Sequence, residues 1–593
     1  MMFSALAVSL VAIAPIETTK SSTEVASPIT CAEGVETLAA AMKAVSTSQT
    51  LEERGQLDEA EIVLRSGLKC HGQDFERDPA AAELLRDQLF NLLIERAKYE
   101  EARRLAEAWQ KLTLDLARQE KISWKAVRSA GARLGVAHFM KGGFQQAFRE
   151  FPSILGVYRF DDPRYHYFEL FRKFTNSRVR DGQGANWEVK AFANRVEKFS
   201  GDHFTLRKGY FKYSIKLIHL LHDIEDYHNA IRLSDILLSQ YAQGSFPLDV
   251  QYFQIVAEKA GALAALSRFE EARALFDQAN LNLAKLLPPN SPARARTALL
   301  EGKTYLLQGN TFAAEESLLQ SYRLVSVIYG PTHPRAGTPL SIIAQIHLAR
   351  RNLDDANTYL EAAEKAFAIR PIGPIAGYDD FLFTDLVAGF LLSDYDRVQR
   401  SSYEYRKNRG HNNSELKRAK FVGTLNWIAS IELGTSAWLN SENLAKSEFR
   451  KYRSLYGYET DPLTRWWALL LEWAGDRWEK RKTEDYRLFF ATRVNTYRIY
   501  DEAFRLLQDI ERPGSTDRLR LSLKMSKLLA QIDYDRVGPL PYNLAKQLVD
   551  GGVDAINFTD SYDEDDLERT TLSRPVFRAA VRNFYAMSSV GRD

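Results

Sequence analysis

Two histidines and two aspartates in the middle of the chain have a spacing that could bind a metal ion. His219 and His222 lie three residues apart, and Asp223 and Asp226 follow, so nitrogen and oxygen ligands could share one side of a helix. The sequence indicates no HExxH motif and no distant third ligand to complete such a site. We therefore favour a partly buried helix end over a zinc site, and we expect no cofactor.

Other arrangements typical of catalysis or ion binding are incomplete. An acidic cluster lies near the C-terminus, at Asp560, Asp563, Glu564, Asp565 and Asp566. It lacks the glycine and the final glutamate of an EF-hand, so we interpret it as a solvated loop. No Walker-type phosphate loop and no dinucleotide fingerprint occurs. We assign no catalytic residue and predict a protein that is not an enzyme; the alternative is an enzyme with an unrecognised site within residues 466–593.

Two features indicate the compartment. The segment MMFSALAVSLVAIA resembles the apolar part of a signal peptide, although no Lys or Arg precedes it and Pro15 follows it. It is shorter than the roughly 20 apolar residues of a membrane-spanning helix. The cysteines are Cys31 and Cys70 alone, which fits an exported chain, and a disulfide between them would stabilise the fold by roughly 4 kcal/mol. We predict export to the periplasm; the alternative is a cytoplasmic protein that keeps this segment.

Any functional residue must be positioned by helices that recur at a fixed period along the sequence. Ala230, Ala272, Ala314, Ala356 and Val398 are each forty-two residues apart. Each is the fourth residue of a similar segment, such as FEEARALFDQA or LDDANTYLEAA, whose apolar residues recur at helical spacing. A small side chain is needed where two helix backbones approach closely. The period therefore predicts a recurring helix pair that buries its apolar face by stacking on its neighbours.

A second apolar helix precedes each of these segments. One example contains Ala298, Leu299, Gly302, Tyr305 and Leu306 at helical spacing. It ends in the sequence Gln-Gly-Asn at residues 308–310, where glycine can adopt a positive φ. The repeating unit is therefore helix, tight turn, helix.

This unit resembles the tetratricopeptide repeat across residues 215–410. The segment with Gly330, His333 and Pro334 resembles the forty-two-residue kinesin light chain type, in which a Gly-x-x-His-Pro loop joins one helix pair to the next. Pro292 and Pro334 suit the first turn of a helix, because proline lacks only a donor that is unused there. The resemblance implies a right-handed superhelix whose concave face, lined by the first helices, binds a peptide or a partner protein.

We predict an all-α, right-handed solenoid of about nine or ten such helix pairs. Ala60, Ala102 and Ala147 extend the repeat toward the N-terminus with some slack. The predicted segments are a signal peptide or disordered N-terminus (1–27), N-terminal repeats (28–150), a degenerate aromatic-rich region (151–214), the regular array (215–410), divergent helical repeats (411–513) and a C-terminal helical cap and tail (514–593).

The charge balance excludes a strong field for nucleic acid. Lys and Arg number 79 against 77 Asp and Glu, which gives a net charge of +2. We therefore expect a protein or peptide partner and no nucleic acid. The candidate partner-binding residues, chosen from the first helices, are Arg296, Lys303, Gln345 and His347. The alternative role is a structural subunit of a larger envelope assembly, and the oligomeric state stays open.

A tryptophan-rich segment, WWALLLEWAGDRWEKR, begins at Trp466. Trp466 and Trp473 lie seven residues apart and could share a helical face with Leu469 and Leu470. Tryptophan with this pattern is more often buried in a core than exposed at an interface. We expect the segment to be structural, and we expect residues 573–587 to cap the solenoid.

Overall fold

A computed structural model describes most of the chain between residues 37 and 530. The described ranges are 37–71, 78–151, eight residues between 164 and 175, 211–223, 226–243, 247–350, 352–369, 377–409, 417–434, 438–456, 463–481, 486–510 and 516–530. The predicted signal peptide, the acidic cluster near residue 560 and the predicted cap at 573–587 lie outside these residues. The segment boundaries predicted above stay predictions.

All regular structure within the described residues is helical. The N-terminal group comprises α1 (Thr37–Glu53), α2 (Leu57–His71), α3 (Pro79–Glu95), α4 (Tyr99–Arg118), α5 (Trp124–Met140) and α6 (Phe144–Glu150). The middle group comprises α9 (Phe211–Asp223), α10 (Tyr227–Gln243), α11 (Val250–Ala265), α12 (Phe269–Leu286), α13 (Pro292–Leu307), α14 (Thr311–Tyr329), α15 (Pro334–Ala349) and α16 (Leu353–Ala366), followed by a short 3-10 helix (Phe367–Ile369). The C-terminal group comprises α17 (Tyr378–Leu391), α18 (Tyr395–Arg409), α19 (Lys417–Gly434), α20 (Trp438–Tyr456), α21 (Thr464–Glu479), α22 (Tyr486–Ile510) and α23 (Thr516–Ala530).

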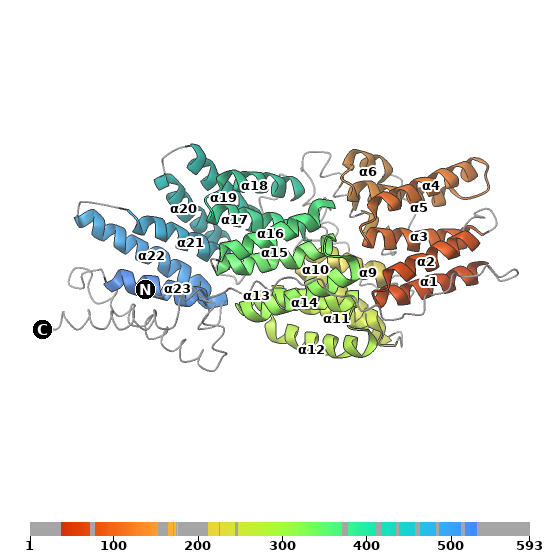
Figure 1. Ribbon diagram of the computed structural model, residues 1–593, viewed down its shortest axis with the longest axis horizontal. Helices are drawn as coiled ribbons and strands as arrows, with labels where there is room; N and C mark the ends of the chain where they lie inside the picture. Colours follow the sequence, from red (N-terminus) through yellow and green to blue (C-terminus); the bar gives the residue numbers. More distant parts are fainter. Residues whose placement is uncertain are drawn as a thin grey trace, which may run out of the picture.

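These helices pack as successive pairs. Within the described part of the chain there are ten pairs, from α1 with α2 to α21 with α22, and α23 packs on α22. Figure 1 shows α1–α6 at one end of an elongated molecule, α17–α23 at the other end, and α9–α16 between them. The prediction of an all-α solenoid of about nine or ten helix pairs is confirmed; the hand of its superhelix stays a prediction.

The small residues of the period lie where the helices of a pair meet. Ala230, Ala272, Ala314, Ala356 and Val398 are each 0% exposed. Gly302 of α13 serves the same contact from the other helix, because a Cβ there would lie 2.6 Å from Cγ of Leu318 and 3.2 Å from the carbonyl oxygen of Ala314. The forty-two-residue period is therefore a packing requirement, as the sequence predicted.

The ends of the helices also follow the sequence signals. Gly309, in the turn between α13 and α14, has a φ of 76°. Pro292 and Pro334 are the first residues of α13 and α15. His333 precedes α15 and caps it, because its Nδ1 accepts a hydrogen bond of 3.2 Å from the Arg335 backbone N–H.

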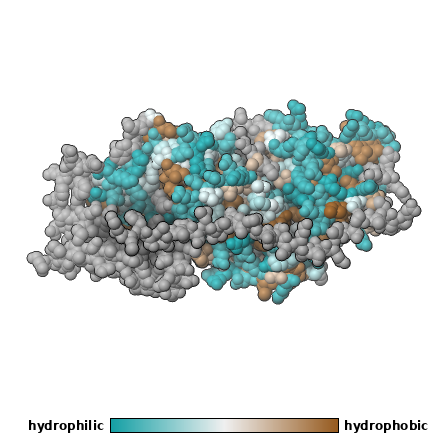
Figure 2. Space-filling view, viewed as in Figure 1, coloured by the Kyte–Doolittle hydropathy of each residue, from teal (hydrophilic) through white to brown (hydrophobic). Residues whose placement is uncertain are grey.

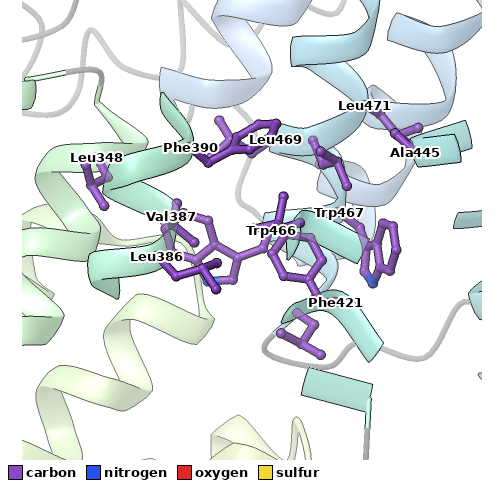
Figure 3. Close-up of a cluster of buried hydrophobic side chains, with 14 of the residues drawn as sticks. Leu348, Leu386, Val387, Phe390, Phe421, Ala445, Trp466, Trp467, Leu469 and Leu471 are labelled. Atoms are coloured by element: carbon purple, nitrogen blue, oxygen red, sulfur yellow. The ribbon is translucent and has the colours of Figure 1, made fainter. Parts of the chain in front are cut away.

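Aromatic side chains fill the core of the C-terminal group, as Figure 3 shows around Trp466 and Trp467. The ring of Trp466 lies 5.6 Å from that of Phe383, edge to face, and the ring of Trp467 lies 5.0 Å from that of Phe421. Trp467 is 1% exposed. The structural interpretation of the tryptophan-rich segment is confirmed for these two residues.

The outer surface carries hydrophobic residues in small separate groups. Figure 2 shows such groups on an otherwise largely hydrophilic face, including one over α12 at its lower edge, where Leu281 and Leu286 are exposed. Scattered apolar side chains of this kind are ordinary on soluble surfaces. Among the described helices, none has both the length and the hydropathy to cross a bilayer.

Candidate functional site

The beginning of the solenoid contacts its middle, across more than two hundred residues of sequence. The hydroxyl of Tyr329, at the end of α14, donates a hydrogen bond of 3.0 Å to Oε1 of Glu95, at the end of α3. Nε2 of His333 lies 2.9 Å from the backbone oxygen of Glu95, and Nη1 of Arg335 lies 3.4 Å from its Oε1. We call these four residues (Glu95, Tyr329, His333 and Arg335) the clasp. It joins α3 to the beginning of α15.

A second contact of the same kind lies beside the clasp. Gly55, in the turn between α1 and α2, has a φ of 78°, and a Cβ there would lie 2.5 Å from the carbonyl oxygen of Asn290. Asn290 belongs to the loop that precedes α13. Helices α1–α3 therefore meet α13–α15, and the helix pairs between them curve around a central space. We call this part of the molecule, from α1 to α15, the first turn.

A cavity of about 300 Å³ lies inside the first turn. Its walls come mainly from the first helices of successive pairs (α1, α3, α9, α11, α13 and α15), and the clasp forms part of one wall. This volume is at the lower end of the range for ligand pockets. The resemblance placed a binding surface on the first helices, and the cavity is a hollow lined by those helices.

The forty-two-residue period also runs along the wall of the cavity. Gln251, Ala293, Arg335 and Gly377 are successive members of one register position, and all four line the cavity. A second register position contributes Gln254, Arg296 and Thr338. Of these seven residues only Arg296 was predicted. Extending the period from the buried alanines to the other positions in and just before the first helices would have found the other six.

Arg296, one of the four candidates, lies in the cavity wall as half of a buried ion pair. Its Nε and Nη2 donate hydrogen bonds of 2.8 and 3.0 Å to the two carboxylate oxygens of Glu258 on α11. Burial alone would raise the pKa of Glu258, but Arg296 and His219 together, through charge and hydrogen bonds, outweigh burial and hold that pKa well below its usual range. Arg296 therefore neutralises the buried carboxylate of Glu258.

The two histidines with metal-like spacing both contact Glu258. Nε2 of His219 lies 3.0 Å from Oε1 of Glu258, and Nε2 of His222 lies 2.9 Å from the backbone oxygen of Glu258. Burial lowers the pKa of both histidines, that of His222 to about 4, so both are neutral at pH 7. Within the described ranges, no group of three or more His, Cys, Asp or Glu residues is arranged to hold a metal ion.

Lys303 lines the same cavity further along α13. Its Nζ lies 3.3 Å from Oδ2 of Asp380 on α17, and Nη1 of Arg418 lies 2.9 Å from the other oxygen of that carboxylate. Burial would raise the pKa of Asp380, but the two cations lower it, Lys303 first. Lys303 therefore connects the cavity wall to the C-terminal group.

Gln345 and His347 lie elsewhere on α15. Nε2 of Gln345 donates a hydrogen bond of 2.8 Å to Oγ1 of Thr384 on α17. His347 stacks on Tyr359 of α16, with ring centroids 5.2 Å apart. The structure thus brings Arg296 and Lys303 together in one cavity and leaves Gln345 and His347 outside its wall; a partner-binding role for any of the four stays a prediction.

The predicted disulfide involves one residue outside the described part of the chain. Cys70 lies near the end of α2, whereas Cys31 precedes the first described residue. Their pairing stays a prediction.

Glutamine side chains supply hydrogen-bonding groups to the cavity. Gln251 and Gln254 lie three residues apart on α11, and Gln49 comes from α1. Oε1 of Gln251 is buried, and within the described residues it has no hydrogen-bond partner. A buried carbonyl oxygen in this state lacks a hydrogen-bond donor.

Comparison with known proteins gives no family. No protein-family model and no curated protein sequence matches the chain. Among solved structures, the crystal structure of Ypp1 is similar over 92% of this chain and 98% of its own, with 10% sequence identity and a TM-score of 0.28. A score this low has no bearing on function.

Proposed function

We propose that the protein is a non-enzymatic scaffold of the tetratricopeptide type, with repeats like those of kinesin light chain, and that it binds a segment of a protein partner in the cavity of the first turn. The observation that carries this proposal is a hollow lined by first helices, with the side-chain amides of Gln49, Gln251 and Gln254 in its wall. An extended polypeptide presents backbone N–H and C=O groups to such amides at regular intervals.

A tryptophan in the cavity tests the proposal. Gln254→Trp would fill space on the wall, whereas Gln278→Trp places the same side chain on the exposed face of α12. We expect partners that co-purify with the tagged wild-type chain from native cells to be lost from Gln254→Trp and kept by Gln278→Trp, as measured by quantitative mass spectrometry. Partner recovery from Gln254→Trp at the wild-type level would contradict the proposal.

Charge reversal at Arg296 would be a poorer test. A carboxylate at this position would face Glu258, which is 2% exposed at its side chain, and two unpaired buried charges would destabilise the fold. Lost binding could then reflect unfolding. Gln254 has no part in that ion pair, so its substitution separates the two effects better.

We also propose that the protein acts in the bacterial cell envelope. The apolar run at the N-terminus and the presence of Cys31 and Cys70 support this proposal. Cell fractionation should recover the chain with periplasmic markers, shortened by loss of its first residues. Recovery of the full-length chain with cytoplasmic markers would contradict export and leave the binding proposal intact.

A further inference from the structure

The formal charges of the cavity wall cancel. Its carboxylates are Glu52, Glu53, Glu95 and Glu258, and its basic side chains are Lys216, Arg296, Lys303 and Arg335. Arg296 pairs with Glu258 at 2.8 Å, and Arg335 lies 3.4 Å from Glu95. Glu52 accepts hydrogen bonds from the side chains of Ser48 and Gln88. With four acidic and four basic side chains, the wall offers no net formal charge to a ligand.

The remaining ionisable groups of the wall are neutral or engaged. Burial lowers the pKa of His333 to about 3, and it lowers that of His219, so neither carries charge at pH 7. Nζ of Lys216 donates a hydrogen bond of 3.1 Å to Oδ1 of Asn91 and lies 5.7 Å from the ring centre of Tyr167. A charged ligand would therefore lose its hydration at a wall that carries no net formal charge to compensate it.

The wall does offer amides and apolar surface. Gln49, Gln251 and Gln254 bring side-chain amides, each able to donate and to accept a hydrogen bond. The apolar side chains of the wall include Ile94, Met140, Phe171, Ile215, Leu299 and Val325. Amides beside apolar side chains match a peptide backbone and an apolar residue within it.

The size of the cavity limits the length of its occupant. A volume of about 300 Å³ is at the small end for ligand sites, so it holds a short anchor and not a long peptide. Most of the partner must then lie outside the cavity.

We infer that the occupant is a short, extended and uncharged peptide segment, with an apolar side chain against the wall and its amides bonded to Gln251 and Gln254. This inference rests on the proposed function, because it names the chemistry of the segment that the same cavity would hold. It excludes acidic and basic motifs as anchors, although charged residues can flank the anchor outside the cavity.

Three synthetic peptides test the inference with the full chain. They share blocked ends, glycine-rich flanks and a fluorophore, and differ in a central Gln-Leu-Asn, Glu-Leu-Asp or Lys-Leu-Arg. In fluorescence anisotropy titrations we expect the neutral peptide to bind at least about tenfold more tightly than either charged peptide. We expect its binding to be lost in Gln254→Trp and kept in Gln278→Trp.

The outcomes separate this inference from the proposed function. Equal or tighter binding of a charged peptide, no saturable binding of the neutral peptide, or equal binding of the neutral peptide to Gln254→Trp would each overturn the inference. If Gln254→Trp still loses its native partners, the scaffold proposal survives such a result. If those partners are retained, the proposed function itself fails.

Discussion

The first turn and the C-terminal group (α17–α23) are built from the same helix pairs but differ in what lies against their first helices. The register position that holds Ala257 and Leu299 in the cavity wall holds Phe383 in α17, forty-two residues beyond Ser341. Phe383 packs on Trp466. At this register position smaller side chains line the hollow of the first turn, whereas an aromatic side chain fills the core of the C-terminal group.

The two regions also differ in the long-range contacts that close them, that is, that join helices distant in the sequence. In the first turn the clasp joins α3 to α15 and borders the cavity. In the C-terminal group, Arg520 of α23 donates hydrogen bonds of 2.8 Å to both carboxylate oxygens of Glu472 on α21, and one of 3.3 Å to the backbone oxygen of Ala349 at the end of α15. This second closure is buried and connects α23 to α21 and α15.

The largest loss of stability is expected from removing an aromatic side chain from the core of the C-terminal group. Trp467→Ala removes a side chain that is 1% exposed and should reduce the free energy of unfolding by about 3–5 kcal/mol. Trp427→Ala, at a position 55% exposed on α19, should change it by less than about 0.5 kcal/mol. Hydrogen exchange should show faster opening of α19–α21 with α1–α5 unchanged, because each pair contacts chiefly its neighbours. Equal acceleration at both ends would contradict the separation of the two regions.

Removing the second closure should have a somewhat smaller effect. Arg520→Met leaves the buried carboxylate of Glu472 with Lys524, whose Nζ lies 2.7 Å away, as its remaining described cation, so we expect a loss of about 3 kcal/mol in urea unfolding. Arg505→Met is the matched control, because Arg505 is 58% exposed and its pair with Asp501 is worth less than about 1 kcal/mol. Similar losses in the two variants would show that the Arg520 cluster is not a structural closure.

Removal of a single hydroxyl group tests the clasp. Tyr329→Phe removes one hydroxyl, which donates to Glu95 and accepts a hydrogen bond of 2.8 Å from Nη1 of Arg335, so we expect a loss of about 1 kcal/mol. Amide exchange at the end of α3 should accelerate. Tyr322→Phe on the same helix, outside the clasp, should leave α3 unchanged. Unaltered exchange near Glu95 in Tyr329→Phe would mean that the clasp does not hold the first turn.

The smallest effect should depend on pH. Glu301 of α13 accepts a hydrogen bond of 2.6 Å from Asn280, and burial raises its pKa to about 7. A raised pKa in the folded state means that the native protein holds this proton more tightly, so its contribution to stability falls as pH rises from about 4.5 to about 7. Glu301→Gln should therefore stabilise the protein by about 1 kcal/mol at pH 8 and not at pH 4. Thermal unfolding at the two pH values measures this, and a pH-independent difference would refute the assignment.

Local features of the fold could be predicted from the sequence, and the closure of the first turn could not. The period of Ala230 and its equivalents specifies helix pairs, because a small residue is required at each contact. The clasp depends on the summed rotation of several pairs between Glu95 and Tyr329, which no local pattern encodes. Because a local pattern does not encode the curvature of the solenoid, it also could not show which of the candidate site residues line the cavity. Lys303 and Gln345 share a register position, yet Lys303 lines the cavity and Gln345 bonds to Thr384 of the next pair.

Photo-crosslinking in native cells tests most directly whether the first turn holds a partner. A photoreactive phenylalanine analogue would replace Gln254 or Thr338 in the cavity wall, Gln278 on the exposed face of α12, or Trp427 in the C-terminal group. We predict that the same partner is crosslinked from positions 254 and 338 and that none is crosslinked from 278 or 427. Crosslinks from the outer positions alone, or from all four equally, would contradict binding in the cavity of the first turn.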